Sequence, residues 1–357
     1  MTSIDRESMY WCLDLLSEQV VKHFVSANLR NNSMLEVNTP PNNFLKRCDI
    51  EMNIGRMSVR QPRACHAGAP FASGTLSDPF KPSPDMPIPA SDARPRTVEL
   101  SWRNKLLQLE LDWVGAAESA YSPVVFLHEG LGSVSLWKDF PETFCRAHGF
   151  TGLVFSRYGY GRSTARPHDE RWPVDFMQQQ AREVMPALLA KLGLVKPWVF
   201  GHSDGASIAL LLAARHGDAL SGAVVAAPHI MVEDISIASI AQAREAYLAG
   251  GLRERLARHH ADVDSAFWGW NDIWLDPAFR SWDIRAEVAR IRVPLFAIQG
   301  EDDEYGTLEQ VEGIARLVPQ AQVLVIPGCG HSPHRDAPAC VIEAAGRFIV
   351  EHTPVWG

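Results

Sequence analysis

The stretch VFGHSDGASIAL, residues 199–210, decides how this chain folds. It begins as an apolar run, breaks at Gly201 and Gly205 with Ser203 between them, and continues as a helix of small residues. An apolar run ending in such a turn is typical of a buried parallel strand that passes directly into a helix. The glycines allow a sharp, strained turn that would hold the Ser203 hydroxyl out at the mouth of a sheet. Tight packing of a strand-helix corner is the alternative explanation.

The rest of the chain from about residue 97 alternates strands and helices. TVELSW and LLQLELDWV alternate apolar and polar residues, which predicts an antiparallel pair of strands. Five further apolar runs end in glycine- or proline-containing turns: PVVFLHEG, GLVFSRYG, SGAVVAAPH, VPLFAIQGEDD and AQVLVIPGCGH. Residues 173–192 have the apolar spacing of a helix. The pattern predicts an α/β fold with a doubly wound, mostly parallel sheet of about eight strands.

The domain organisation follows from two breaks in this pattern. Residues 1–95 form an N-terminal extension, predicted to be partly disordered, with an amphipathic helix over 8–30 and a linker over 60–96 that holds eight of the 24 prolines. The core spans 96–231 and 292–357. Residues 232–291 are helical, rich in tryptophan and longer than one crossover requires, so they predict an inserted helical lid.

Composition narrows the class of protein. Hydrophobic content of 46% and charged content of 21% are ordinary for a globular protein. The formal charge of -8 argues against a nucleic-acid or anionic-membrane partner. Six cysteines without a framework spacing, and an N-terminus without the features of a signal peptide, lead us to expect a cytoplasmic protein with a small-molecule substrate. The sequence is compatible with a homo-oligomer but does not indicate one.

Three residue types with complementary chemistry follow three different predicted strands: Ser203, then Asp302-Asp303, then His331. A serine hydroxyl needs a base to become a nucleophile, and a histidine can supply it when a carboxylate fixes its tautomer. In an open α/β sheet the carboxyl ends of the strands lie together, so these side chains can meet. Ser203 is therefore predicted to be the nucleophile.

Over residues 97–353 the chain resembles the α/β-hydrolase fold superfamily. The motifs that carry the resemblance are the nucleophile turn at 201–205, the G-x-x-D turn at 300–303, the G-H turn at 330–331 and the SRYGYGRS loop at 156–163. The resemblance implies a triad of Ser203, Asp303 and His331, which needs no cofactor. It also implies an oxyanion hole made by backbone N–H groups, one from Asp204 and the second from Gly130 or Leu131.

Two departures from the family pattern concern carboxylates. The oxyanion loop reads His128-Glu129-Gly130, where a His-Gly opening is usual, and Asp204 directly follows the nucleophile. Glu129 and Asp204 either bias the pocket toward neutral or cationic substrates, or point to solvent or cap the helix.

Several alternative roles compete with this interpretation. Asp204 could be the nucleophile, as in the dehalogenase and epoxide-hydrolase branches of the fold, but the glycines centre on Ser203. Asp302 or Asp234 could replace Asp303 as the acid. Cys329, His331 and His334 could bind a metal by ligand type, but no second ligand pair lies nearby, so no metal is expected.

Candidate substrate-binding residues are Trp268, Trp270 and Trp274 of the insertion, together with Arg157. The tryptophans could pack the lid, line the pocket, or do both. Histidines 128 and 334 are expected to be structural. Residues His259 and His260 are expected on a solvated helix face.

The function predicted from these residues is a serine hydrolase that cleaves an ester, thioester or lactone of a small to medium hydrophobic acid. One alternative is a carbon–carbon bond hydrolase of the type that acts on aromatic ring-fission products, with Arg157 or Arg162 binding a substrate carboxylate. Another is a receptor that keeps the fold with little turnover.

Overall fold

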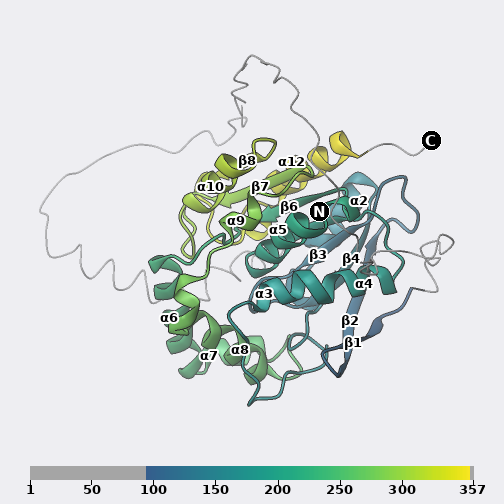
Figure 1. The fold of residues 1–357 in the computed structure, drawn as a ribbon. Helices are drawn as coiled ribbons and strands as arrows, with labels where there is room; N and C mark the ends of the chain where they lie inside the picture. Colours follow the sequence, from purple (N-terminus) through teal and green to yellow (C-terminus); the bar gives the residue numbers. More distant parts are fainter. Residues whose placement is uncertain (1–93, 354–357) are drawn as a thin grey trace, which may run out of the picture. The chain divides into compact units, whose positions relative to one another are not determined.

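The structure is a computed structural model that describes residues 94–353 (Figure 1). Within this range an eight-stranded sheet carries helices on both faces, so the predicted α/β fold with a mostly parallel sheet is confirmed. The N-terminal extension predicted over residues 1–95, with its helix and most of its linker, lies outside the described residues apart from its last two positions.

The sheet has the strand order β1-β2-β4-β3-β5-β6-β7-β8. Strands β1, β2 and β4 pair in antiparallel fashion, and all other neighbours are parallel. Residues of β1 alternate between exposed and buried, as its alternating sequence predicts, whereas β3 to β7 are buried on both faces. The bounds are β1 Thr97–Trp102, β2 Lys105–Gly115, β3 Val124–Leu127, β4 Thr151–Phe155, β5 Trp198–His202, β6 Gly222–Ala226, β7 Leu295–Gly300 and β8 Gln322–Ile326.

The helix predicted over residues 173–192 is present but consists of three segments. Its middle turn, over Gln180–Val184, is a π-helix that lies just before Pro186, a residue without an N–H to continue the ladder. The helices are α2 Phe140–His148, α3 Phe176–Gln179, α4 Met185–Lys191, α5 Asp204–His216, α6 Asp234–Leu248, α7 Gly251–Leu256, α8 Val263–Leu275, α9 Arg285–Val288, α10 Glu309–Leu317, α11 Pro333–Asp336 and α12 Pro338–His352.

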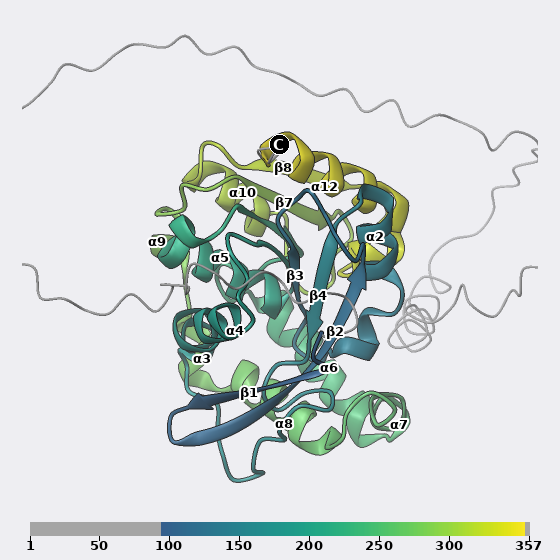
Figure 2. The same ribbon diagram turned by 90° about the vertical axis from the view of Figure 1, so that its right-hand side faces the viewer.

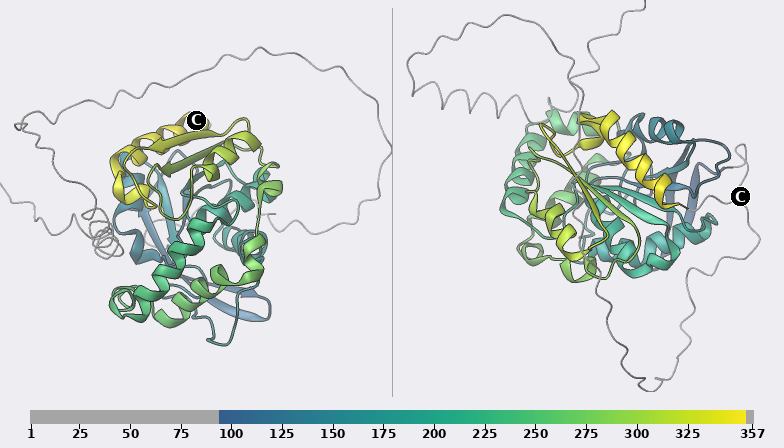
Figure 3. Two further views of the ribbon diagram at one scale, coloured as in Figure 1. Left: turned by 90° about the vertical axis from the view of Figure 1, so that its left-hand side faces the viewer. Right: turned by 90° about the horizontal axis from the view of Figure 1, so that it is seen from above.

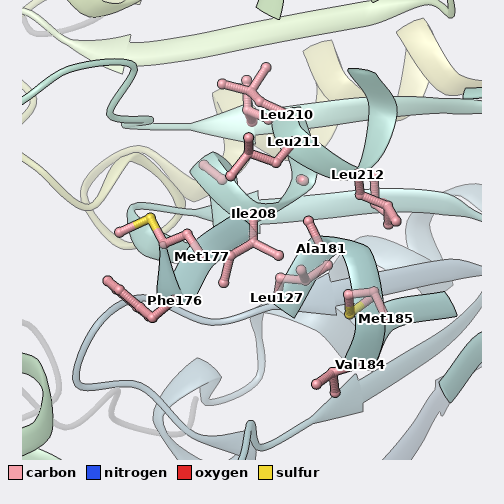
Figure 4. Packing of buried hydrophobic residues seen from close by; sticks show 14 of the residues in the cluster. Leu127, Phe176, Met177, Ala181, Val184, Met185, Ile208, Leu210, Leu211 and Leu212 are labelled. Atoms are coloured by element: carbon pink, nitrogen blue, oxygen red, sulfur yellow. The ribbon is translucent and has the colours of Figure 1, made fainter. Parts of the chain in front are cut away.

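Alternate residues of β3 serve the two hydrophobic layers of the core. Val124 and Phe126 join the cluster that α2 and α12 cover, and Leu127 joins the cluster that α3, α4 and α5 cover. Figure 3 shows helices on the two faces of the sheet, and Figure 4 shows Leu127 in one cluster with Ile208 of α5 and Met177 of α3. The central strands are therefore shielded from water on both sides, which fixes the positions of their ends.

The segment between β6 and β7 contains α6, α7, α8 and α9, and we call residues 234–288 the helical insertion. Helices α6, α7 and α8 lie together at one end of the sheet, away from α12 (Figures 1 and 2). Three short 3₁₀ turns, over Val134–Trp137, Gly217–Ala219 and Pro277–Ser281, lie in the loop after β3, after α5 and after α8.

The sheet reverses its winding direction between β3 and β5. From β3 the chain passes to β4 on one side, and then crosses to β5 on the other side of β3. In α/β sheets such a reversal opens a crevice at the carboxyl ends of the two strands, where ligands bind. The loop that begins at His128 and the turn that contains Ser203 both lie at this point.

Three backbone segments approach closely at the end of β5. A Cβ atom on Gly201 would lie 2.3 Å from the carbonyl oxygen of Gly205. A Cβ atom on Gly205 would lie 2.1 Å from the carbonyl oxygen of Leu127, at the end of β3. Backbone atoms cannot move aside as a flexible side chain can, so both positions require glycine.

We predict that Gly205→Ala lowers the free energy of unfolding by at least about 2 kcal/mol, because the added methyl group overlaps the β3 backbone. Gly251→Ala is the matched control, since its nearest neighbour would be Arg255 at 3.6 Å. That control should change stability by no more than about 0.5–1 kcal/mol, in the stabilising direction if at all. Chemical denaturation of both variants measures the difference, and equal midpoints would contradict the packing argument.

Candidate active site

Ser203 occupies the strained turn between β5 and α5. Its φ of 52° and ψ of -119° are unusual for a residue with a side chain. The backbone holds this conformation because the Ser203 N–H donates to Ala226 O of β6 at 3.0 Å and the Ser207 N–H donates to Ser203 O at 3.0 Å. Only 7% of Ser203 is exposed.

The three residues predicted as a triad meet at the carboxyl edge of the sheet. Nε2 of His331 lies 2.9 Å from Oγ of Ser203, and Nδ1 of His331 lies 2.8 Å from Oδ1 of Asp303. Since a carboxylate can only accept, Nδ1 of a neutral His331 carries the proton and Nε2 accepts from the serine hydroxyl. This arrangement allows Ser203 to lose its proton to His331 as it attacks.

The structure brings Asp303, and neither of its two alternatives, next to His331. Asp303 is buried, its Oδ1 accepts the Tyr305 N–H at 2.9 Å, and its Oδ2 accepts from Nε2 of Gln299 at 3.2 Å. Asp302 is exposed. The carboxylate of Asp234 is 89% exposed and pairs with Arg280 at the surface.

Burial and charge have opposite effects on the pKa values of His331 and Asp303, and charge outweighs burial at both residues. Burial lowers the pKa of His331, but the charge and hydrogen bond of Asp303 outweigh it and hold that pKa above its ordinary value of 6.5. Burial raises the pKa of Asp303, but His331 and the Tyr305 N–H outweigh it and keep the pKa low. Asp303 is therefore an anion that stabilises the imidazolium formed when His331 takes a proton.

The loop after β3 has a rigid backbone. The carbonyl oxygen of Glu129 accepts from Nδ1 of His128 at 2.7 Å, Nη2 of Arg157 at 2.8 Å and the Gly132 N–H at 3.1 Å. Nε2 of His128 accepts the Arg157 N–H at 2.9 Å, so His128 must be neutral with its proton on Nδ1. Burial, the largest influence, lowers the pKa of His128 well below its ordinary value, in agreement with that tautomer.

The carboxylate of Asp204 is 1% exposed, so of the alternatives considered for it the one that it points to solvent is wrong. Its Oδ1 accepts from Nε1 of Trp274 at 3.1 Å, and its Oδ2 lies 3.9 Å from Nη2 of Arg157. Burial raises its pKa to about 6, against the effect of Arg157 and the Trp274 hydrogen bond.

The Glu129 carboxylate is also largely enclosed, at 18% exposed. It lies 3.5 Å from Nδ1 of His202 and 3.3 Å from Nη2 of Arg335. Burial raises its pKa, but these two partners outweigh burial and hold the pKa well below the ordinary value. The Glu129 carboxylate therefore interacts with side chains of the protein and does not point freely into solvent.

The predicted substrate-binding tryptophans divide into two groups. Trp270 contacts the loop after β3, because a Cβ atom on Gly130 would lie 2.2 Å from its indole ring. Trp274 donates to Asp204, as described above. Trp268 instead packs against Tyr247, at 5.6 Å between ring centroids, and under the guanidinium of Arg244.

Arg157 has internal partners rather than a free guanidinium. It is buried, donates to the Glu129 carbonyl and lies over the Tyr160 ring at 4.8 Å. The structure therefore makes Arg157 part of the scaffold of the loop after β3. Arg162, the other residue considered for a substrate carboxylate, is exposed.

The expectation that His260 lies on a solvated helix face is wrong. His260 is 6% exposed; its Nδ1 accepts the Gly161 N–H at 2.9 Å, and its Nε2 donates to Leu131 O at 2.9 Å. It thereby ties the helical insertion to both loops that border the site. Its neighbour His259 lies 2.8 Å from the Ser135 hydroxyl.

Two buried histidines beside His331 were not singled out from the sequence. Nε2 of His202 donates to the His331 carbonyl at 2.7 Å, and the His229 ring lies 5.7 Å from the His331 ring. Burial lowers the pKa of His229 to about 3, so it stays neutral. His202 ends the buried strand β5, and His229 follows the buried strand β6. Their positions at the ends of apolar runs are the sequence signal that could have identified them. His334, expected to be structural, packs against the rings of Trp137 and His202.

Among residues 94–353 no group of three His, Cys, Asp or Glu side chains has the arrangement of a metal site. In the same range no helix is both long enough and apolar enough to cross a bilayer.

We compared the chain with protein families and with solved structures. A family model described as the alpha/beta hydrolase family matches residues 124–344. A thermophilic esterase from Thermogutta terrifontis superposes with a TM-score of 0.57 at 18% identity, covering 73% of this chain and 100% of the esterase. At that identity the superposition speaks for the fold alone.

Two curated relatives of similar identity to this chain have different printed activities. An sn-1-specific diacylglycerol lipase of Mus musculus is 26% identical over 261 residues, covering 63% of this chain and 80% of the lipase. A 2-succinyl-6-hydroxy-2,4-cyclohexadiene-1-carboxylate synthase of Salmonella typhimurium is 24% identical over 259 residues, covering 63% of this chain and 93% of the synthase.

We predict that Asp303→Asn lowers the pKa of His331, because burial remains while the largest opposing charge and its hydrogen bond are lost. Asp302→Asn is the matched control and should leave that pKa above its ordinary value. NMR titration of histidine Cε1–H signals measures both, with His331→Gln to assign the resonance. A shift of equal size in the two variants would show that the local pairing of Asp303 and His331 is not the cause.

Proposed function

The chain belongs to the alpha/beta hydrolase family, and from this premise we propose that it is a serine hydrolase acting on an ester, thioester or lactone of a small to medium hydrophobic acid. The observation that carries the proposal is the continuous hydrogen-bonded path from Ser203 Oγ through His331 to Asp303. This path supplies an activated nucleophile without a cofactor.

In the acylation step Ser203 Oγ attacks the substrate carbonyl while its proton moves to Nε2 of His331. The resulting imidazolium is stabilised by Asp303, whose carboxylate stays ionised. His331 then gives the proton to the leaving oxygen or sulfur, the bond to the leaving group breaks, and an acyl-serine remains. For a lactone the leaving group stays attached as a hydroxyl on the same molecule.

In the deacylation step water takes the place of the leaving group. His331 removes a proton from the water as it attacks the acyl carbon, and returns the proton to Ser203 Oγ as the acid is released. The serine, the histidine and the carboxylate all return to their starting states.

The oxyanion of both tetrahedral intermediates would be held by the N–H groups of Asp204 and Gly130. Leu131 is the alternative second donor, but the Glu129–Gly130 peptide is better fixed. The Glu129 carbonyl has three donors, and in a trans peptide the Gly130 N–H points the opposite way, so its direction is set as well. One such donor is worth on the order of 3 kcal/mol of barrier lowering.

The helical insertion is proposed as a lid, because Trp270 contacts the loop after β3 and Trp274 donates to the residue that follows Ser203. The hydrophobic acid stays an expectation from the tryptophan-rich sequence of the insertion. A groove of about 400 Å³ between α6 and α8 is bordered by Asp234 and Arg280 and contains none of the three triad residues, so it is not the substrate site that we propose.

The carbon–carbon hydrolase alternative has weaker support. It would need a cation for the substrate carboxylate, and Arg157 is occupied by the Glu129 carbonyl and by Asp204. The expected partner is a small molecule, and cytoplasmic localisation stays an expectation from the sequence.

We predict that a fluorophosphonate probe labels Ser203 stoichiometrically, because His331 activates its hydroxyl. Ser203→Ala should abolish labelling, and His331→Ala should slow it by at least about 100-fold. Mass spectrometry of the labelled peptide identifies the residue. A panel of acetate esters, thioesters, lactones and a dienone then separates the ester hydrolase from the carbon–carbon hydrolase.

Ser101→Ala is the control, since Ser101 is exposed on the edge strand β1 and should leave labelling unchanged. If the correctly folded wild-type protein were not labelled and hydrolysed none of the panel, a receptor with little turnover would replace the hydrolase as the better proposal.

A further inference from the structure

Two tryptophans of the helical insertion lie one helical turn apart on α8. Trp270 and Trp274 are four residues apart, so they project from the same face of the helix. Both are buried, with 7% and 1% of their surface exposed. Trp268, two residues before Trp270, projects elsewhere and packs against Tyr247.

Trp274 contacts the nucleophile turn. Its indole N–H donates to Oδ1 of Asp204, the residue that directly follows Ser203. Within residues 94–353 this indole is the only hydrogen-bond donor to the Asp204 carboxylate. Nη2 of Arg157 lies 3.9 Å from Oδ2, which is too far for a hydrogen bond, and Oδ2 accepts none from another group in that range. A buried carboxylate that loses such a donor has a strong tendency to move or to take up a proton. Any such movement would carry along the Asp204 backbone.

Trp270 contacts the opposite side of the oxyanion hole. Its ring fills the space where a Gly130 side chain would be, at 2.2 Å from the position of a Cβ atom. One residue further along, Nε2 of His260 donates to the Leu131 carbonyl. The insertion therefore contacts the loop after β3 at two consecutive residues.

From these contacts we propose that the helical insertion holds the oxyanion hole in its working geometry, with Trp270 and Trp274 as positioning residues for its two N–H donors. The proposal rests on the serine-hydrolase function argued above and deepens it. Trp274 acts through the Asp204 side chain, and Trp270 acts through the Gly130 backbone.

A pair of substitutions separates the hydrogen bond of Trp274 from its packing. Trp274→Phe keeps an aromatic ring but removes the N–H donor. Trp274→His removes the larger ring but keeps an N–H at the same place in a five-membered ring. The matched controls are Trp268→Phe and Trp268→His on another face of the same helix.

The measurement is steady-state hydrolysis of p-nitrophenyl acetate, together with inhibition by phenylboronic acid, which forms a tetrahedral anion on an active serine. For Trp274→Phe we expect kcat to fall by about tenfold or more with KM nearly unchanged, and boronate affinity to fall in parallel with kcat/KM. Trp274→His should retain more activity than Trp274→Phe. Both Trp268 variants should stay within about twofold of the wild type.

Three results, each with an active wild type, would overturn the inference but leave the proposed function standing. Trp274→Phe could have the kcat and KM of the wild type, or it could have a raised KM with a normal kcat. Trp274→His could be less active than Trp274→Phe. A raised KM would make Trp274 a wall of the substrate pocket, and the reversed order would make it a packing residue.

Trp270→Phe provides a second test if Trp274→Phe fails to fold, which thermal unfolding of every variant will show. In Trp270→Phe kcat should again fall without a matching rise in KM. A wild type that neither hydrolyses the ester nor binds the boronate overturns the proposed function itself.

Discussion

The close approach of three backbone segments at the end of β5 is the constraint on which the site depends. Gly201, Gly205 and the Leu127 carbonyl fit together without space for a single Cβ atom. This contact, together with the Ser203 N–H bond to β6, holds Ser203 at a φ of 52°. Such a conformation persists only when the surrounding structure imposes it. Because α5 starts at Asp204 in the same turn, Ser203 stands at the helix end where backbone N–H groups lack a partner within the helix.

A crowded group of histidines shows how burial and charge assign different roles to one residue type. Burial dominates at His128, His229 and His334 and lowers the pKa of each, so they remain neutral. At His331 the Asp303 carboxylate reverses the outcome and raises the pKa. Among these four histidines only His331 has a hydrogen-bonded carboxylate, so the base that we propose is distinguished by one neighbour rather than by its degree of burial.

The strands and the triad geometry could be predicted from sequence because both have local signals. Apolar runs that end in glycine turns mark the strands, and Ser203, Asp303 and His331 each stand directly after such a run. Contacts made by the insertion lack a local signal. His260 meets Leu131 across 129 positions of the chain, and Trp274 meets Asp204 across 70. Charged and polar patterns suggested solvent exposure for Asp204 and His260, and tertiary contacts overrode that suggestion.

Enclosure of the site has opposite effects on the two negative charges near Ser203. An oxyanion held by backbone N–H groups is stabilised more strongly where water is excluded, since the effective dielectric constant is lower. For the same reason a carboxylate at Asp204 would repel that oxyanion more strongly. Arg157, 3.9 Å from Oδ2 of Asp204, reduces this repulsion by its countercharge, and burial raises the pKa of Asp204 to about 6, which makes its ionised form less favourable. For the proposed reaction, exclusion of water helps to the extent that the charge of Asp204 is balanced in this way.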